Sequence, residues 1–366
     1  MGELGISIYP DKTTFERDKV YLDLAHKYGF KRVFTSLLQI TDNKDTVLAN
    51  FKRTIDYANQ LGMEVMIDIN PALFKQLEIS YHDLSFFADL GVAGVRLDLG
   101  FTGKEEADMT RNPYGLKIEI NMSFGNNYVD NIMDYSPNKD RLIGSHNFYP
   151  HRYSGLEYEH FLRCSQKFKK YNLNTLAFVT SQQATFGPWP IQDGLCTLEE
   201  HRNLDIVTQV KHLMLTGVID DICIGNAYAS EEELSAMAET FKANYPSIKV
   251  NLSPDTTETE KSVLLNHLHN YRGDCSEYLL RSSNTRVLYH EQSFPAHNTC
   301  DIIRGDILID NDKYGQYKGE TQVALKAMKN DGRVNVVGRI VDSELFLLTF
   351  LKPWSSFKFI EDKPQI

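Results

Sequence analysis

Short apolar segments recur along the first two-thirds of the chain, and stretches with helical periodicity, such as residues 13–29 and 45–62, lie between most of them. Near-continuous apolar strands that alternate with helices are typical of a parallel sheet covered by helices. Eight such strands are expected, at residues 5–9, 32–37, 64–69, 94–99, 117–122, 142–148, 175–180 and 220–225.

The segments between these strands repeat the same end signals. A glycine commonly closes the helical pattern, because glycine takes the left-handed conformation after a helix at little cost. Eight β/α units in about 235 residues match a closed (β/α)8 barrel in number and length. A doubly wound open sheet, the alternative, usually has fewer strands, and no glycine-rich phosphate loop follows the first strand. Capping-box spacing predicts helix starts at Thr13 with Glu16, Ser154 with Glu157, Thr197 with Glu200, and Ser230 with Glu233.

The pattern changes at about residue 250. Residues 301–310 and 333–341 look like strands, and little helical periodicity remains in this part of the chain. We therefore expect an α/β protein with a TIM-barrel domain over residues 1–240 and a smaller β-rich domain over residues 250–366.

Composition and charge narrow the class of protein. The 366 residues carry a formal net charge of −10, which argues against a nucleic-acid partner, since that role needs a concentrated basic face. No apolar run approaches membrane-spanning length, and no secretory signal is visible at the start. The five cysteines are scattered without a CxxC pair, which favours reduced thiols over a zinc site. We expect a cytoplasmic protein without metal, cofactor or membrane partner, and the sequence leaves the oligomeric state open.

Polar side chains gather toward the ends of the middle strands, where the sites of (β/α)8 barrels lie. Because alternate residues of a strand share a face, charged and amide groups on the third to fifth strands should point into the barrel, opposite apolar residues. On the sixth strand a histidine is the expected inward group. The residues concerned are Asp68, Arg96, Asp98, Glu119, Asn121 and His146.

An internal ion-pair network is the structural alternative for any one of these carboxylates, with Arg96 as the cation. Three carboxylates on successive strands favour a functional site, since charges are rarely buried unless paired or functional. Two carboxylates that flank a bond suit glycoside hydrolysis. A Schiff-base enzyme would need a lysine near a strand end, and Lys117 begins its strand. No cluster of histidines for a metal hydrolase and no GxSxG elbow is visible.

The loops after the later strands suit a polar ligand. Trp189 could stack on a sugar ring or merely pack its loop, and Arg202 could pair with an anionic group. Asn226 follows the eighth strand. Arginines of the second domain could form an anion pocket, although solvated surface positions are the alternative for each of them. These arginines are Arg272, Arg281, Arg286 and Arg304.

Several motifs together resemble one bacterial family, the 6-phospho-N-acetylmuramidase (MupG) family, formerly a domain of unknown function. The motifs are RLDLGF from residue 96, KIEINMS from residue 117, HNFYPHRYSGL from residue 146, GLCTLEEHR from residue 194 and IRGDILIDNDKYGQYKGE from residue 303. The resemblance covers essentially the whole chain and implies a TIM barrel followed by a cyclophilin-like domain. It implies hydrolysis of 6-phospho-N-acetylmuramyl-N-acetylglucosamine in peptidoglycan recycling, with N-acetylmuramic acid 6-phosphate and N-acetylglucosamine as products.

Our hypothesis from strand parity makes Glu119 the general acid and Asp98 or Asp68 the nucleophile or base. The sugar hydroxyls or acetamido group would be held by His146, Asn147 and Asn121, and the phosphate by Arg202 with Arg272, Arg281 or Arg304. Retention or inversion stays open at this level. The alternative function is a phosphosugar-binding or regulatory protein that uses the barrel as a scaffold without turnover.

Overall fold

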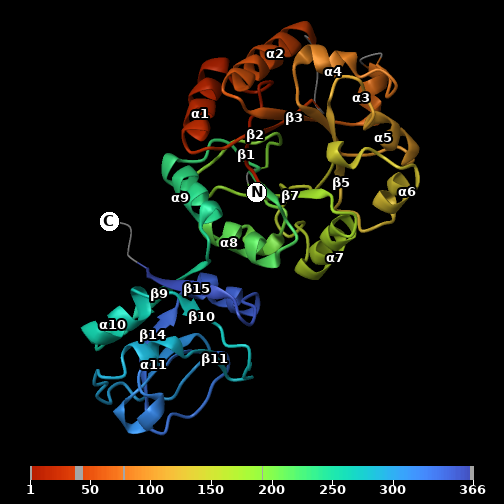
Figure 1. Ribbon diagram of the computed structural model, residues 1–366. Helices are drawn as coiled ribbons and strands as arrows, with labels where there is room; N and C mark the ends of the chain where they lie inside the picture. The colour runs from red at the N-terminus through yellow and green to blue at the C-terminus, as the bar shows by residue number, and fades with distance from the viewer. Residues whose placement is uncertain (1, 38–43, 77–78, 192, 363–366) are drawn as a thin grey trace. The chain divides into compact units, whose positions relative to one another are not determined.

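The computed structural model describes residues 2–37, 44–76, 79–191 and 193–362. The chain divides into two compact units, Met1–Lys242 and Ala243–Ile366. Figure 1 shows the first as a ring of helices around strands and the second as a separate, mostly stranded body.

The first unit is a closed barrel of eight parallel strands in sequence order, which confirms the predicted (β/α)8 architecture. Each expected apolar segment contains one strand, because a parallel strand buried on both faces needs an almost continuous apolar run. The strands are β1 Leu4–Ser7, β2 Arg32–Ser36, β3 Glu64–Ile69, β4 Gly94–Leu97, β5 Lys117–Asn121, β6 Leu142–Ser145, β7 Asn174–Val179 and β8 Asp221–Ile224.

Helices and two 3-10 turns surround this barrel (Figure 1). Of the four predicted capping boxes, the one between Ser230 and Glu233 forms in both directions, with N···O distances of 3.1 and 3.2 Å. The elements are α1 Phe15–Lys27, α2 Lys44–Gln60, α3 Pro71–Gln76, α4 Ser85–Leu90, α5 Lys104–Met109, α6 Tyr128–Asp134, η1 Lys139–Arg141, α7 Tyr158–Lys169, η2 Glu199–His201, α8 Ile206–Thr216 and α9 Glu231–Lys242.

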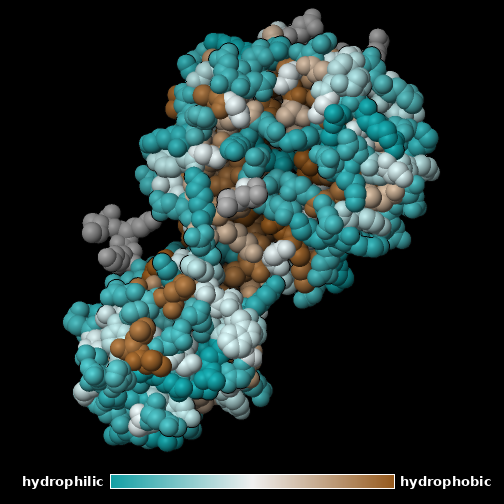
Figure 2. All heavy atoms as spheres, in the orientation of Figure 1, coloured by the Kyte–Doolittle hydropathy of each residue, from teal (hydrophilic) through white to brown (hydrophobic). Residues whose placement is uncertain are grey.

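The apolar core of this unit lies between the strands and the helices. On β3, Val65, Ile67 and Ile69 are fully buried and share one core cluster with Leu22 of α1 and Phe51 of α2. In Figure 2 the visible surface of the barrel unit is mostly hydrophilic, and hydrophobic atoms show chiefly in its recesses. The alternate residues of the same strands are thereby left for the barrel interior, where polar groups gather.

The second unit contains a seven-stranded sheet in the order β10-β15-β9-β14-β12-β13-β11, which confirms a β-rich domain. Its strand pairs are antiparallel except for β15 with β9. The elements are β9 Ser247–Leu252, α10 Glu258–Leu265, β10 His269–Asn270, β11 Leu279–Ser282, α11 Asn284–Leu288, β12 Asp306–Asp310, η3 Asp312–Tyr317, β13 Thr321–Ala324, β14 Val334–Ile340, η4 Asp342–Thr349 and β15 Ser356–Glu361. Among the residues that the structure describes, no helix is both long and apolar enough to cross a membrane.

Candidate active site

A cavity of about 250 Å³ opens at the carboxyl ends of the barrel strands. Its walls come from the ends of β1 to β4 and from the loops after β6 and β7. Tyr9, Asp11, Lys12, Phe34, Ser36, Asp68, Arg96, Asp98, Asn147, Phe148, Tyr149, Pro150, Pro188 and Trp189 line it. The site therefore lies at the end of the barrel where the sequence predicts it.

Arg96 organises the floor of this cavity. Its guanidinium donates to Asp68 Oδ1 at 2.6 Å, to Ser145 Oγ at 2.8 Å and to the amide oxygen of Asn147. The same Nη1 lies 3.6 Å from Asp98 Oδ1. Because Arg96 is 2% exposed, these charge-assisted contacts fix the positions of both aspartates.

Asp68 and Asp98 face the cavity in different environments. The Asp68 side chain is 7% exposed and that of Asp98 is 33% exposed. Both contact Nη1 of Arg96, at 2.6 and 3.6 Å, so the two contacting oxygens are at most 6.2 Å apart, the sum of those distances. Burial raises the pKa of Asp68 to about 7, with a further increase from the nearby carboxylates, and Arg96 limits that increase.

Glu119 pairs with β4 in the expected register, opposite Arg96, but it does not line the cavity. Its Oε2 accepts a hydrogen bond from Arg32 at 2.7 Å, and Arg32 also binds Asp221 at 2.6 Å. Arg32 and Asp221 begin β2 and β8, so Glu119 is directed toward the starts of the strands. The location does not fit the general-acid role expected for Glu119, since the carboxyl group is 1% exposed and does not face the cavity.

His146 was expected to point inward, and the structure contradicts this. Its ring packs on Phe161 of α7, with ring centroids 4.7 Å apart, and its nitrogens lie 3.2 Å from Ser123 Oγ and 2.9 Å from Ser165 Oγ. Burial lowers its pKa to about 3, so the ring is neutral. The inward residues at this strand end are Ser145 and Asn147, which both bind Arg96.

Asn121 and Asn226 hold loops rather than the main cavity wall. Asn121 Nδ2 donates to the backbone oxygen of Asp98 at 3.1 Å, so it fixes the backbone at that aspartate. Asn226 accepts from the Ser181 N–H at 2.8 Å and donates to the Ser181 oxygen at 2.9 Å, which fixes the loop after β7. Neither amide lines the main cavity, so a direct sugar contact there is not supported for either residue.

Arg202, expected to bind phosphate, is a buried brace between loops. Its guanidinium forms two hydrogen bonds with Glu199, at 2.6 and 2.7 Å. Its Nη1 donates to the backbone oxygens of Tyr149 and Asp193, each at 3.0 Å. Because Arg202 is 3% exposed and its donors point to these partners, its position does not suit capture of a substrate anion.

A second, polar cavity of about 200 Å³ lies beside the loop after β7. Arg152 contributes to its wall with a half-exposed side chain, 3.7 Å from Asp193. Asn203 and Asn226 also line this cavity, as does Gln182. An arginine in such a polar wall is suited to an anionic ligand group.

The sequence analysis located Asp68, Arg96 and Asp98 at the cavity, along with Asn147 and Trp189. It missed other wall residues, chiefly Asp11 and Lys12, which follow β1 directly, as well as Phe34 and Ser36 at the end of β2. The signal that could have found them is the same strand-end rule, applied to the first two strands.

The predicted arginines of the second unit have partners within that unit. Arg272 binds Asp274, with one contact of 2.7 Å, and Arg281 binds the buried Glu320 at 2.6 Å. Arg304 is exposed, and its Nη2 lies 3.5 Å from the Leu345 oxygen. Each arginine is thus described as part of its own unit.

Comparisons with known proteins give the chain a family. Models of the N-terminal and C-terminal parts of 6-phospho-N-acetylmuramidase match residues 4–239 and 246–360. The crystal structure of an uncharacterized B. cereus protein shares 48% sequence identity, with a TM-score of 0.90 over 98% of this chain and 99% of that chain. A conserved Enterococcus faecalis protein with an unknown function shares 26% identity, with a TM-score of 0.75 over 98% of this chain and 96% of that chain. No curated protein matches the sequence.

Proposed function

The chain belongs to the 6-phospho-N-acetylmuramidase family of glycosidases, and on that premise we propose that it hydrolyses 6-phospho-N-acetylmuramyl-N-acetylglucosamine. The products are N-acetylmuramic acid 6-phosphate and N-acetylglucosamine, and the reaction serves peptidoglycan recycling in the cytoplasm. The observation that carries the proposal is the pair of carboxylates, Asp68 and Asp98, held by Arg96 at the floor of the cavity.

In this proposal Asp68 is the general acid. Its pKa of about 7 leaves much of the carboxyl group protonated at neutral pH, and a catalytic acid works best with a pKa near the operating pH. Asp68 donates its proton to the glycosidic oxygen as the bond to N-acetylglucosamine breaks. Asp98, which is more exposed and lies 3.6 Å from the Arg96 cation, supplies the carboxylate that acts as the nucleophile.

The spacing of the two carboxylates favours retention of anomeric configuration. Inverting glycosidases need roughly 6.5–9.5 Å between their carboxyl groups to leave room for water, and retaining ones have about 5–5.5 Å. The upper limit of 6.2 Å between the contacting oxygens of Asp68 and Asp98 lies below the inverting range. Asp98 thus attacks the anomeric carbon, and water later displaces it while Asp68 takes back a proton.

The phosphate and lactyl carboxylate of the substrate need cations. Within the barrel unit we propose Lys12 at the main cavity and Arg152 at the polar cavity, because each lines a wall of its cavity. Trp189 is 39% exposed at the main cavity and offers a face for a sugar ring. Arg272, Arg281 and Arg304 stay proposed as further anion contacts, and the exposed Arg304 is the first of them to replace by alanine.

The deciding experiment incubates the purified protein with the 6-phosphorylated disaccharide and with its unphosphorylated twin, and identifies products by mass spectrometry. We expect cleavage of the phosphorylated substrate only. Early NMR spectra should show the product with retained anomeric configuration. Lys12→Met should reduce kcat/KM for the phosphorylated substrate, with Lys19→Met of α1 as a surface control. Equal cleavage of both disaccharides would contradict phosphate recognition, and cleavage of neither would contradict the proposed substrate.

A further inference from the structure

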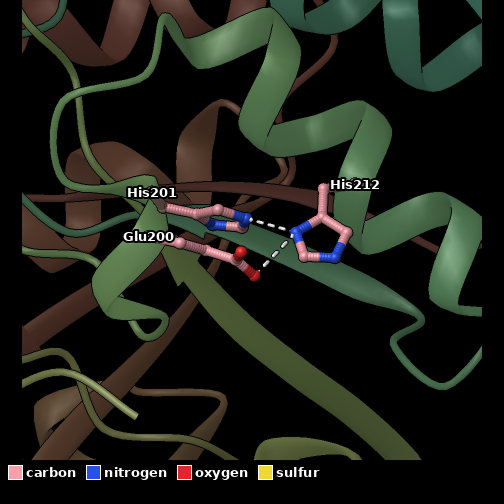
Figure 3. Close-up of side chains that lie close together, drawn as sticks. All are labelled: Glu200, His201 and His212. Carbon is pink, nitrogen blue, oxygen red and sulfur yellow. Dashed lines mark hydrogen bonds and ion pairs between the residues drawn. The ribbon is translucent and has the colours of Figure 1, made fainter. Parts of the chain in front are cut away.

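Two buried histidines and a glutamate converge between η2 and α8, outside both cavities (Figure 3). His201 Nε2 lies 2.9 Å from His212 Nδ1, and the same Nδ1 lies 3.4 Å from Glu200 Oε1. Both imidazoles are 0% exposed, whereas the Glu200 side chain is 42% exposed. The cluster therefore has an apolar, enclosed side and one side that is open to water.

The separations suit a tetrahedral metal ion. Zinc bonds of roughly 2.0–2.1 Å to nitrogen or oxygen imply about 3.3 Å between neighbouring ligand atoms. The observed 2.9 and 3.4 Å are close to that value, so only the histidine pair has to open slightly. All three candidate ligand atoms lie within 4.8 Å of one another.

The histidines are also in the required chemical state. Burial lowers the pKa of His212 to about 4 and that of His201 further, so both rings are neutral near pH 7. In the N···N hydrogen bond one ring carries its proton on the inner nitrogen, and metal binding needs that proton on the outer nitrogen of the same ring. Such a change of tautomer releases no proton from the pair.

The protein alone leaves this cluster incompletely satisfied. His201 Nδ1 is buried without a hydrogen-bond partner, which is uncommon for buried polar atoms in native proteins. His201 Nε2 meets only another imidazole at 2.9 Å. Two coordinate bonds to one cation would replace a single bond between two neutral rings, and the Glu200 carboxylate would balance part of the cation's charge.

We propose that Glu200, His201 and His212 bind a Zn²⁺ ion, with water as the fourth ligand on the exposed side. Imidazole and carboxylate ligands suit zinc and exclude the all-oxygen preference of Mg²⁺ and Ca²⁺. The site is structural, since none of its residues lines either cavity. The ion ties η2 to α8 and thereby steadies Glu199, whose carboxylate accepts from the Tyr153 and Gly155 N–H groups, each at 2.8 Å. This proposal is independent of the sugar substrate, and it differs from the sequence expectation of no metal.

The test uses the full-length protein after treatment with a chelator and dialysis. Titration with ZnCl2 in a calorimeter should give one ion per chain, and zinc should raise Tm by several degrees, whereas MgCl2 should not. Metal analysis of the dialysed complex checks the stoichiometry. A protein that binds no stoichiometric zinc and shows no change of Tm would overturn the proposal.

Variants locate the site. Glu200→Gln changes a half-exposed side chain, so it should fold, and we expect zinc affinity to fall at least tenfold, the scale of outer-shell changes at other zinc sites. His212→Asn should abolish binding. His269→Gln is the matched control, because His269 is also buried and neutral, with a pKa lowered to about 4, but lies in the second unit. A Cys275→Ser/Cys300→Ser variant controls for the exposed thiols. Zinc binding that survives Glu200→Gln unchanged, or that disappears with the cysteines, would also overturn the proposal.

Discussion

At the scale of single residues, the direction in which a carboxylate points decides its role. Asp68 and Glu119 are both buried and both lie near Arg96, at 2.6 and 3.7 Å. Asp68 faces the cavity, whereas Glu119 forms its shorter ion pair with Arg32, at 2.7 Å. The position of the cations, more than burial itself, therefore separates a group available to substrate from one committed to the barrel interior.

The acid assignment predicts opposite results for two isosteric variants. Asp68→Asn should lower kcat for the disaccharide by about 10²–10⁴, the usual contribution of general acid–base catalysis. Glu119→Gln should keep kcat within about tenfold, because it does not face the cavity. An aryl glycoside with a good leaving group should restore much of the glycosylation rate of Asp68→Asn but not that of Asp98→Asn. A large loss in Glu119→Gln with normal activity in Asp68→Asn would return the acid role to Glu119.

The raised pKa of Asp68 predicts a pH dependence. The acid must be protonated, so kcat/KM should be high below the pKa and should fall as pH rises through about 7. Asp68→Asn should lose this limb of the profile, since its amide does not titrate. Initial rates at a series of pH values for both proteins provide the measurement. A wild-type profile that is flat between about pH 6 and 8.5 would contradict the assignment.

Strand parity gave the correct face for Asp68, Arg96 and Asp98, because apolar residues alternate with them on β3 and β4. It could not give depth along the barrel axis, and Glu119 was therefore misjudged. It also failed at His146, since the segment around it has apolar residues on both faces and offers no clear alternation. Arg32 was overlooked because its partners begin distant strands, a relation that only the closed barrel creates.

At the scale of elements, the loops after β6 and β7 are joined by side-chain braces. Arg202 links η2 to the backbone at Tyr149 and Asp193, and Glu199 binds the backbone N–H groups of Tyr153 and Gly155. Loops that carry functional residues need such support from a rigid scaffold. The sequence offered Arg202 as a phosphate ligand because its contacts come from three separate segments of the chain.

Removing this brace should cost stability. Arg202→Met leaves the partly buried Glu199 without its cation, and we expect a loss of about 2 kcal/mol in unfolding free energy, or a fall in Tm of roughly 4–8 °C. Lys27→Met is the control, since its ion pair with Glu231 is exposed on both sides and its Tm should hardly change. Thermal unfolding followed by circular dichroism makes the comparison. Equal Tm values for Arg202→Met and wild type would show that the loops do not depend on this contact.

Helix boundaries were less readable than strands. The Ser230–Glu233 capping box forms, but α7 is capped by Glu157, whose carboxylate accepts from the His160 N–H at 3.2 Å. Thr197 instead hydrogen-bonds the Asn147 oxygen at 2.9 Å, between two loops. Serine, threonine and glutamate can each satisfy either a helix end or a loop, so their spacing alone does not decide between the two.

At the scale of the whole barrel, buried charges form a connected chain through the interior. Asp68 and Arg96 stand near the cavity, Glu119 follows, and Arg32 with Asp221 completes the chain at the strand starts. The length and regularity of the β/α repeat made the barrel predictable from sequence. This ionic interior was predicted only near its upper end, as an alternative reading of Arg96 with its neighbours.

The chain of charges predicts a strong effect of one substitution far from the cavity. Arg32→Met leaves Glu119 and Asp221 buried without their shared cation, and removing one partner of a buried pair typically costs about 3–5 kcal/mol. We expect a fall in Tm on the order of 10 °C. The triple variant Arg32→Met/Glu119→Gln/Asp221→Asn should recover most of the loss, because neutral amides need no cation. If the single variant is as stable as wild type, or the triple variant recovers nothing, the charges do not act as one network and the pKa of Asp68 must depend on its local surroundings alone.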